Sequence, residues 1–156
     1  MSRPLGSKNI EVDAGRLRVL MAQANSNVGT AQFVPLTDPL ESASWDGDAY
    51  ATVSTATQLD LSAVFGAPAG IKAVLMRVAC RDSGTWGTAA GYVILTPDSD
   101  GTPTAMICRC YGGDLYMDKT EVIPCDANGD LWYKLSASGG ATATLDVVLQ
   151  IWGYWI

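Results

Sequence analysis

Hydrophobic and polar residues alternate through much of the chain after residue 50, a pattern typical of half-buried antiparallel strands. The clearest segment is 71–82, in which one face carries four apolar side chains and the other carries Arg77 and Arg81. The four apolar residues are Val74, Met76, Val78 and Cys80. Similar alternation predicts strands at 104–111 and 142–152.

Clusters of Gly, Asp and Pro separate these segments at roughly 8 to 12 residues, the spacing of short antiparallel strands. Further strands are expected at 50–59, 92–96, 115–117, 119–123 and 131–136. One helical turn is expected at 60–66, capped by Asp60 or Ser62 and ended by Gly66. About eight strands and no longer helix predict an all-β protein, an antiparallel jelly-roll-like β-sandwich.

The beginning of the chain has a different character. Residues 1–15 show neither strand nor helix periodicity, and 16–22 (RLRVLMA) alternate briefly before a polar loop. That short strand would add either to the sheet edge of another subunit or to the chain's own sheet. Residues 33–48 contain two prolines and an acidic turn and are expected to be mostly irregular. We therefore expect an extended docking arm at 1–32 and a β-sandwich domain at 33–156.

The charge of the 156-residue chain is unevenly distributed. The net charge is −6, but residues 1–30 carry four basic and two acidic residues, a net of +2. The four basic residues are Arg3, Lys8, Arg16 and Arg18. A basic arm on an acidic body favours docking to an acidic surface, although an ordinary solvated terminus has the same composition. The acidic body argues against nucleic acid as a partner, since phosphate binding needs a concentrated basic face.

The chain contains no histidine, which excludes Ser-His-Asp and Cys-His catalytic sets and the HExxH zinc motif. Asp126, Asn128 and Asp130 resemble the first ligands of a calcium loop, but no glutamate closes that loop. Asp and Asn also favour turns, and the Asn128-Gly129 pair predicts a hairpin turn that accounts for this segment. No residue set assembles acid, base and nucleophile, so we expect no enzyme, no cofactor and no metal.

Four cysteines raise the question of disulfides. Cys108 and Cys110 share one face of a predicted strand and diverge too far to bond to each other. Free buried thiols are usual for a protein folded in a reducing compartment. If a disulfide forms, Cys80 with Cys108 or Cys110 is the preferred pairing, which leaves Cys125 as the odd thiol.

Tryptophans mark two candidate surfaces. Trp86 in a Gly-rich loop and Trp45 beside an acidic turn would either stack on a sugar ring or cover the core. The chain ends in QIWGYWI; with Leu145–Ile151 turned inward, Trp152 and Tyr154 are expected on the opposite face. Those two residues and Trp155 predict a subunit interface, unless the chain's own N-terminal region covers them.

No membrane span or export signal is visible, since the apolar run at 19–22 is far shorter than the roughly 20 residues of a spanning helix. We therefore expect no membrane partner and synthesis in a cytoplasm.

Residues 59–75 (LDLSAVFGAPAGIKAVL) and 145–155 (LDVVLQIWGYW) resemble accessory virion structural proteins of tailed bacteriophages, which include capsid decoration or cement proteins, head fibres and tail modules. The resemblance implies a multimeric β-sandwich, often a trimer, that docks through an N-terminal arm onto the major capsid protein or another virion protein. It thus implies synthesis in the host bacterial cytoplasm and a place in the virion, most simply as a capsid decoration protein. The alternative is a tail-fibre or baseplate module that binds host glycan through Trp86.

Overall fold

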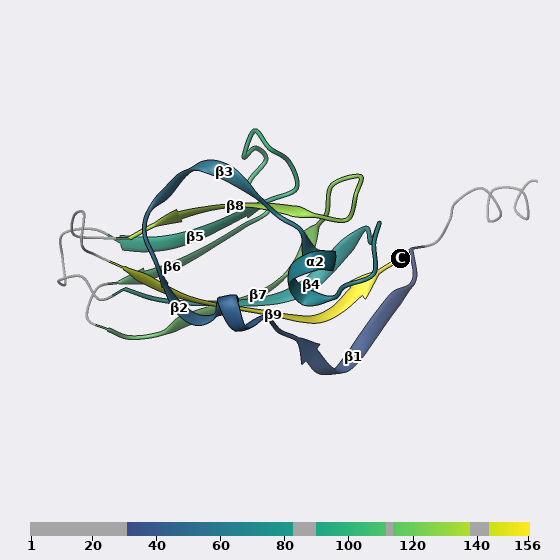
Figure 1. The fold of residues 1–156 in the computed structure, drawn as a ribbon, viewed down its shortest axis with the longest axis horizontal. Helices are drawn as coiled ribbons and strands as arrows, with labels where there is room; N and C mark the ends of the chain where they lie inside the picture. Colours follow the sequence, from purple (N-terminus) through teal and green to yellow (C-terminus); the bar gives the residue numbers. More distant parts are fainter. Residues whose placement is uncertain (1–30, 83–89, 112–113, 138–143) are drawn as a thin grey trace, which may run out of the picture. The chain divides into compact units, whose positions relative to one another are not determined.

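The structure, a computed structural model, describes residues 31–82, 90–111, 114–137 and 144–156. These residues form nine strands, one 3-10 helix and one short α-helix. The strands build two antiparallel sheets that face each other, one in the upper and one in the lower half of Figure 1. The antiparallel β-sandwich expected from the sequence is confirmed.

We call the two sheets A and B. Sheet A contains β1 (Phe33–Leu40), β2 (Asp46–Tyr50), β9 (Leu145–Trp155), β4 (Ala73–Asp82) and β7 (Met117–Pro124). Sheet B contains, in order, β3 (Val53–Leu59), β8 (Leu131–Ser136), β5 (Ala90–Thr96) and β6 (Met106–Tyr111). The helices are η1 (Ala43–Trp45) before β2 and α2 (Leu61–Phe65) before β4.

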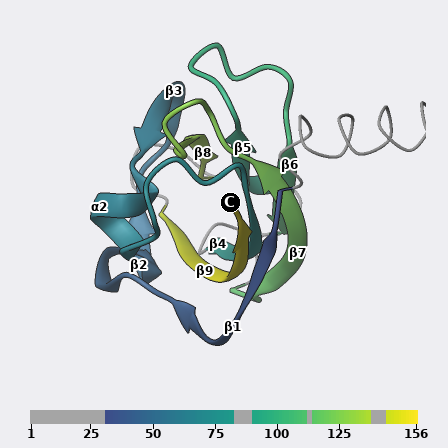
Figure 2. The ribbon, with the colours of Figure 1, turned by 90° about the vertical axis from the view of Figure 1, so that its right-hand side faces the viewer.

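The strand pairing defines a jelly roll. β2 pairs with β9, β3 with β8, β4 with β7 and β5 with β6, so the pairs are nested along the chain. β4 also pairs with β9, and β5 with β8, which winds the nested pairs into two sheets. Figure 2 shows α2 at one margin of the sandwich and β6 beside β7 at the other. β1 is an additional strand on the C-terminal half of β9.

The core lies between the sheets and follows the predicted alternation. The inward residues of β4 (Val74, Met76, Val78 and Cys80) are fully buried. So are those of β9 (Leu145, Val147, Leu149 and Ile151), which makes these two central strands the most apolar layer of sheet A. Trp45 closes the core: it is 5% exposed, stacks on Tyr50 at 4.6 Å and meets Tyr133 edge-on at 5.1 Å.

The predicted helical turn is confirmed as α2. The Asp60 side chain accepts a hydrogen bond from the Ala63 backbone N–H at 2.8 Å, and this bond lowers the pKa of Asp60. Gly66 ends the helix with φ of 71°, a left-handed conformation that glycine adopts without strain. No helix among the described residues is long and apolar enough to span a membrane.

Three expectations about local structure are wrong. The segment 33–48 is not mostly irregular, because β1 and β2 lie within it. The two short strands expected at 115–117 and 119–123 are one strand, β7, which is exposed at a sheet edge and therefore lacks alternation. The turn at 126–130 joins β7 of sheet A to β8 of sheet B, so it is not a hairpin.

Candidate assembly surface

Two rows of apolar residues lie on the outer face of sheet A, at the end where the chain enters and leaves the sandwich. Directly paired residues of neighbouring strands lie on the same face of a sheet. One row consists of Val122, Leu75, Gly153 and Pro35, and the next of Pro124, Ala73, Trp155 and Phe33. We call these eight residues the terminal patch; none of them carries a charged side chain.

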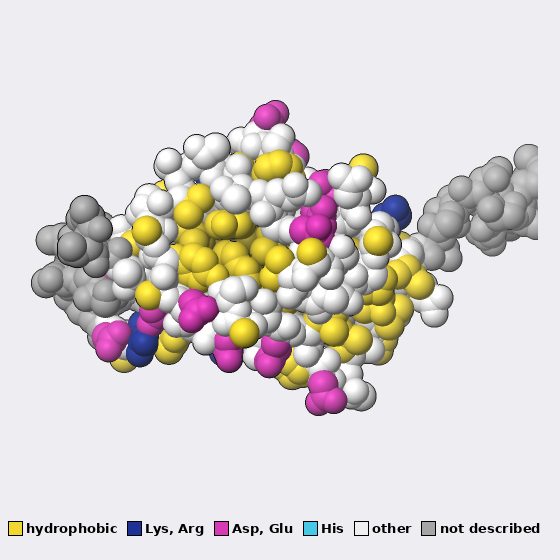
Figure 3. All heavy atoms as spheres, viewed as in Figure 1, with side chains coloured by type: hydrophobic (Ala, Val, Ile, Leu, Met, Phe, Trp, Pro, Cys, Tyr) yellow, Lys and Arg dark blue, Asp and Glu magenta, His cyan; other side chains and the backbone are white. Residues whose placement is uncertain are grey.

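The two strands that hold the ends of the sandwich meet in this patch. Phe33 pairs with Trp155, and their rings lie 4.4 Å apart between centroids. The Phe33 ring lies against Gly153, where a Cβ atom would come within 2.6 Å of ring carbons. Glycine at 153 therefore allows the ring to approach the backbone of β9 closely. Figure 3 shows hydrophobic side chains gathered over β1 and the end of β9, at the lower right.

The three residues predicted at a subunit interface have different surroundings. Trp155 belongs to the terminal patch, and Trp152 is 37% exposed beside it. Tyr154 instead pairs with buried Val74 and packs against the core, contrary to the face expected for it. The register of β9 shifts between Ile151 and Gly153, and this bulge reverses the alternation after Ile151.

Farther along β4, the outer face of sheet A carries ion pairs. Arg77 lies 3.1 Å from Asp118 and donates to Gln150 at 3.0 Å. Arg81 donates to Asp146 at 2.9 Å and lies 3.3 Å from Asp114. These pairs are partly exposed, so each adds little stability. They do make this half of the sheet a solvated surface, unlike the terminal patch.

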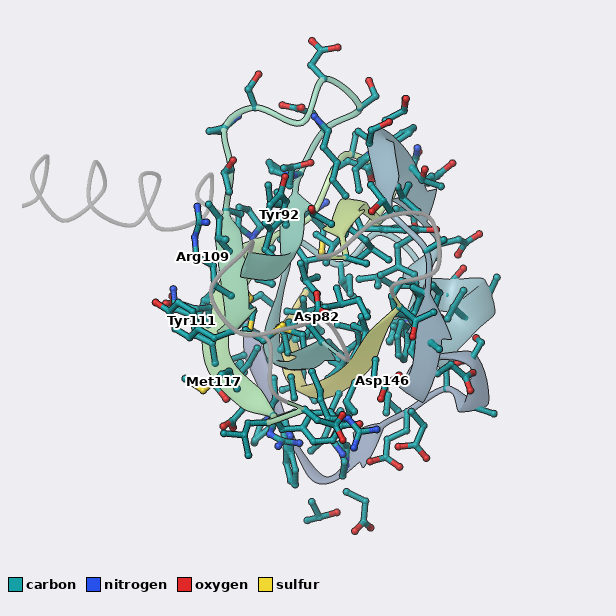
Figure 4. The ribbon with its side chains drawn as sticks, turned by 90° about the vertical axis from the view of Figure 1, so that its left-hand side faces the viewer. Asp82, Tyr92, Arg109, Tyr111, Met117 and Asp146 are labelled. Carbon is teal, nitrogen blue, oxygen red and sulfur yellow. The ribbon has the colours of Figure 1, made fainter. Side chains whose placement is uncertain are left out.

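Other exposed apolar side chains lie at the opposite end of the sandwich, around the connection from β6 to β7. Tyr111, Leu115, Tyr116 and Met117 are 44% to 61% exposed. Figure 4 shows Tyr111 and Met117 at the outer margin, whereas Asp82 lies between the sheets. Two arginines lie over tyrosine rings here: Arg81 over Tyr116 at 4.8 Å and Arg109 over Tyr92 at 5.6 Å. Sequence alternation did not single out these residues because they lie on an edge strand and a turn.

The predicted arm residues Arg3, Lys8, Arg16 and Arg18 lie outside the described residues, as does Trp86. Their roles in docking and glycan stacking stay predictions. Trp45, the other tryptophan considered for glycan stacking, is part of the core and offers no ring face to a ligand.

Three of the four cysteines meet in the core. Cys80 of β4 faces Cys108 of β6, with their sulfurs 3.6 Å apart, and also interacts with Cys110. All four thiols are free. Cys125 lies apart from this cluster, and burial raises the pKa of its thiol to about 12.

The acidic turn suggested as a calcium loop has its carboxylates bound to the chain itself. Asp126 Oδ1 accepts from the backbone N–H groups of Asn128 and Asp130 at 2.8 and 2.9 Å. Asp130 accepts from the Leu61 backbone and from Gln58. Within the described part of the chain, no three His, Cys, Asp or Glu residues are arranged to hold a metal ion.

Fold and surface together define a jelly-roll protein with an uncharged apolar patch at its chain ends. No family model matches the chain, and comparison with curated proteins gave no match either.

Proposed function

We propose that this chain is a structural virion protein of a tailed bacteriophage, most simply a capsid decoration protein, in which copies associate through the terminal patch. The proposed role is non-enzymatic and needs no cofactor. The terminal patch carries the proposal, and the resemblance of residues 59–75 and 145–155 to accessory virion proteins supplies the virion context.

The composition of the patch favours a second copy of the chain as its cover. Contiguous exposed apolar surface is costly in water, and burying it contributes roughly 25 cal/mol per Å². The patch offers no charge for an oppositely charged partner to recognise. In a symmetric homo-oligomer, every copy brings the same uncharged, aromatic surface to the contact, so no complementary charge is needed.

The position of the first described strand supports a role for both the N-terminal arm and the terminal patch in assembly. Gln32 and Ile156 exchange backbone hydrogen bonds of 3.0 and 3.1 Å, so the first strand starts beside the last residue. The described part of the sandwich therefore begins at the edge of the terminal patch. In the proposed assembly, the basic arm anchors to an acidic surface of the capsid or of a neighbouring copy.

Replacement of Val122 tests self-association. Val122 is 50% exposed on edge strand β7, so Val122→Glu places a charge in the patch and leaves the core intact. Thr120→Glu is the matched control, because Thr120 is exposed on the same face of the same strand, two residues away and outside the patch. We expect light scattering to show an oligomer for the wild-type and Thr120→Glu proteins and a monomer for Val122→Glu. A monomeric wild type, or an unchanged Val122→Glu oligomer, would contradict self-association through this patch.

Copy number tests the decoration role. Heads and tails of virions that contain this chain are separated, and the chain is quantified against the major capsid protein by mass spectrometry. A decoration protein should be found on heads in hundreds of copies. A few copies confined to tails would overturn the decoration role and favour the glycan-binding tail module. Deletion of residues 1–30 should abolish binding to heads and leave the oligomer intact.

A further inference from the structure

The three core cysteines lie where the two sheets come together. Cys80 belongs to β4 of sheet A, while Cys108 and Cys110 belong to β6 of sheet B. Their exposed fractions are 0%, 3% and 0%, respectively. Most buried cysteines behave as small apolar residues, but these three contact each other across the core.

The sulfur atoms of Cys80 and Cys108 are already in contact. Their sulfurs are 3.6 Å apart, whereas a disulfide bond is about 2.05 Å long. The Cys80 sulfur lies 3.8 Å from the Cys108 carbonyl oxygen, and the Cys108 sulfur lies 3.5 Å from that of Val78. Each sulfur thus reaches the main chain of the opposite strand. Bond formation requires the two sulfurs to approach each other by about 1.5 Å.

We propose that Cys80 and Cys108 form an oxidation site at which a peroxide joins the two sulfurs in a disulfide between sheets A and B. In the first step the Cys108 sulfur attacks a peroxide oxygen, which forms a sulfenic acid and releases water. In the second step the Cys80 sulfur attacks the sulfenic sulfur, and a second water leaves. Two thiols and one hydrogen peroxide thus give one disulfide and two waters.

The surroundings of the thiols favour Cys108 as the first nucleophile. It is the one member of the cluster with some exposure. The Cys80 thiol donates a hydrogen bond to the Cys108 sulfur, which lowers the pKa of Cys108. Hydrogen bonding to Cys108 and Cys110, together with burial, raises the pKa of Cys80. A hydrogen bond with Cys80 lowers the pKa of Cys110 as well, but Cys110 is fully buried. Cys108 is therefore the thiolate that a peroxide can reach, and Cys80 lies beside it to resolve the sulfenic acid.

The disulfide would be a covalent cross-link between sheets A and B. It links strands that no backbone hydrogen bond joins, because β4 and β6 belong to different sheets. A bond between residues 80 and 108 closes a loop of roughly 29 residues, a length at which disulfides stabilise a fold. Reducing compartments keep such thiols free, whereas oxidising surroundings allow the bond. This inference goes beyond the proposed function and does not depend on it.

Peptide mapping tests the pairing directly, because trypsin places each cysteine in a different peptide. Cleavage after Lys and Arg puts Cys80 in 78–81, Cys108 in 82–109, Cys110 in 110–119 and Cys125 in 120–134. Folded, reduced wild-type protein is treated with hydrogen peroxide, blocked with iodoacetamide and digested. We expect a linked peptide 78–81 with 82–109, lighter by two hydrogens than the sum of its parts. We also expect the unfolding midpoint to rise by roughly 5 to 15 °C.

Three cysteine variants serve as controls. Cys110→Ser and Cys125→Ser should form the same linked peptide and show the same rise, whereas Cys80→Ser should show neither. Because the decisive result comes from the wild-type protein, a variant that fails to fold does not affect it. A link from 78–81 to 110–119, a link through Cys125 alone, oxidised but unlinked cysteines, or no reaction would each overturn the proposal.

Discussion

Replacement of Asp130 tests whether the carboxylate of an acidic turn stabilises the fold through its hydrogen bonds. Asp130 is 7% exposed at the end of the connection between β7 and β8. Its Oδ1 accepts from the backbone N–H of Leu61, the first residue of α2, at 3.1 Å, and its Oδ2 accepts from the Gln58 amide at 2.9 Å. One carboxylate thus ties the turn to the end of β3 and to the start of α2.

The contacts set the size of the effect. In Asp130→Ala the buried Leu61 N–H loses its partner, which costs about 1 to 3 kcal/mol, and the lost bond to partly buried Gln58 adds about 0.5 to 1.5 kcal/mol. We therefore expect a loss of about 2 to 4 kcal/mol. Asp130→Asn keeps an oxygen for Leu61, and the Gln58 amide can turn to present its own oxygen. The expected loss for Asn is therefore below about 1 kcal/mol.

Urea unfolding followed by tryptophan fluorescence measures these losses, because Trp45 is buried in the fold. With a slope of about 2 kcal/mol per M, the Ala variant should unfold at about 1 to 2 M less urea, with an unchanged slope. A urea midpoint for Asp130→Ala within 0.5 M of the wild-type value would contradict the role of Asp130, as would an equal loss of stability in Asp130→Asn. Added calcium should leave the urea midpoint of the wild-type protein unchanged, because backbone and side-chain donors already bind the carboxylates of this turn. A rise of the midpoint with calcium would show that the turn binds the ion.

Two further predictions concern the packing of aromatic residues. Gly153→Ala should lower the free energy of unfolding measured in urea by about 1 to 3 kcal/mol, because the new Cβ atom would collide with the Phe33 ring. In a Phe33→Ala background the same substitution should cost much less, and an equal cost in both backgrounds would refute the stated cause. Burial, Asp48 and Tyr133 raise the pKa of Tyr50 to about 12, so the phenolate is disfavoured in the folded state. The contribution of Tyr50 to stability is therefore complete below pH 10 and falls as the pH rises towards 12. In Tyr50→Phe, unfolding midpoints measured from pH 9 to 12 should fall less steeply than in the wild type. An unchanged slope would show that Tyr50 does not cause the fall.

Central strands were predictable from the sequence because each is buried on one face. The alternation in 71–82 located β4 and its inward residues, and Asp60 and Gly66 located the ends of α2. Edge strands were not predictable in the same way. β1 contains Pro35 and Pro39, which an edge strand tolerates because one side of its backbone pairs with no other strand of the described sheet.

The terminal patch was only partly predictable, because it depends on pairing between residues far apart in the chain. Trp155 was expected at an interface, but Phe33 and Val122 reach the same surface only through the register of β1, β4, β7 and β9. The bulge that turns Tyr154 inward also depends on register, and only Gly153 hints at it. The thiol cluster was closer to prediction, since alternation places Cys80 on the inward face of β4 and Cys108 on that of β6.

The division of the outer face of sheet A explains why the patch is the better candidate for assembly. Away from the terminal patch, Arg77 and Arg81 pair with carboxylates of neighbouring strands, and water can solvate the partly exposed pairs at little cost. Toward the chain ends, the same strands present only uncharged side chains over two successive rows. A partner that covered the first half would have to desolvate those ion pairs, whereas one that covered the terminal patch would remove apolar surface alone. The free energy of the proposed association would therefore favour contact at the terminal patch over contact at the ion-paired half.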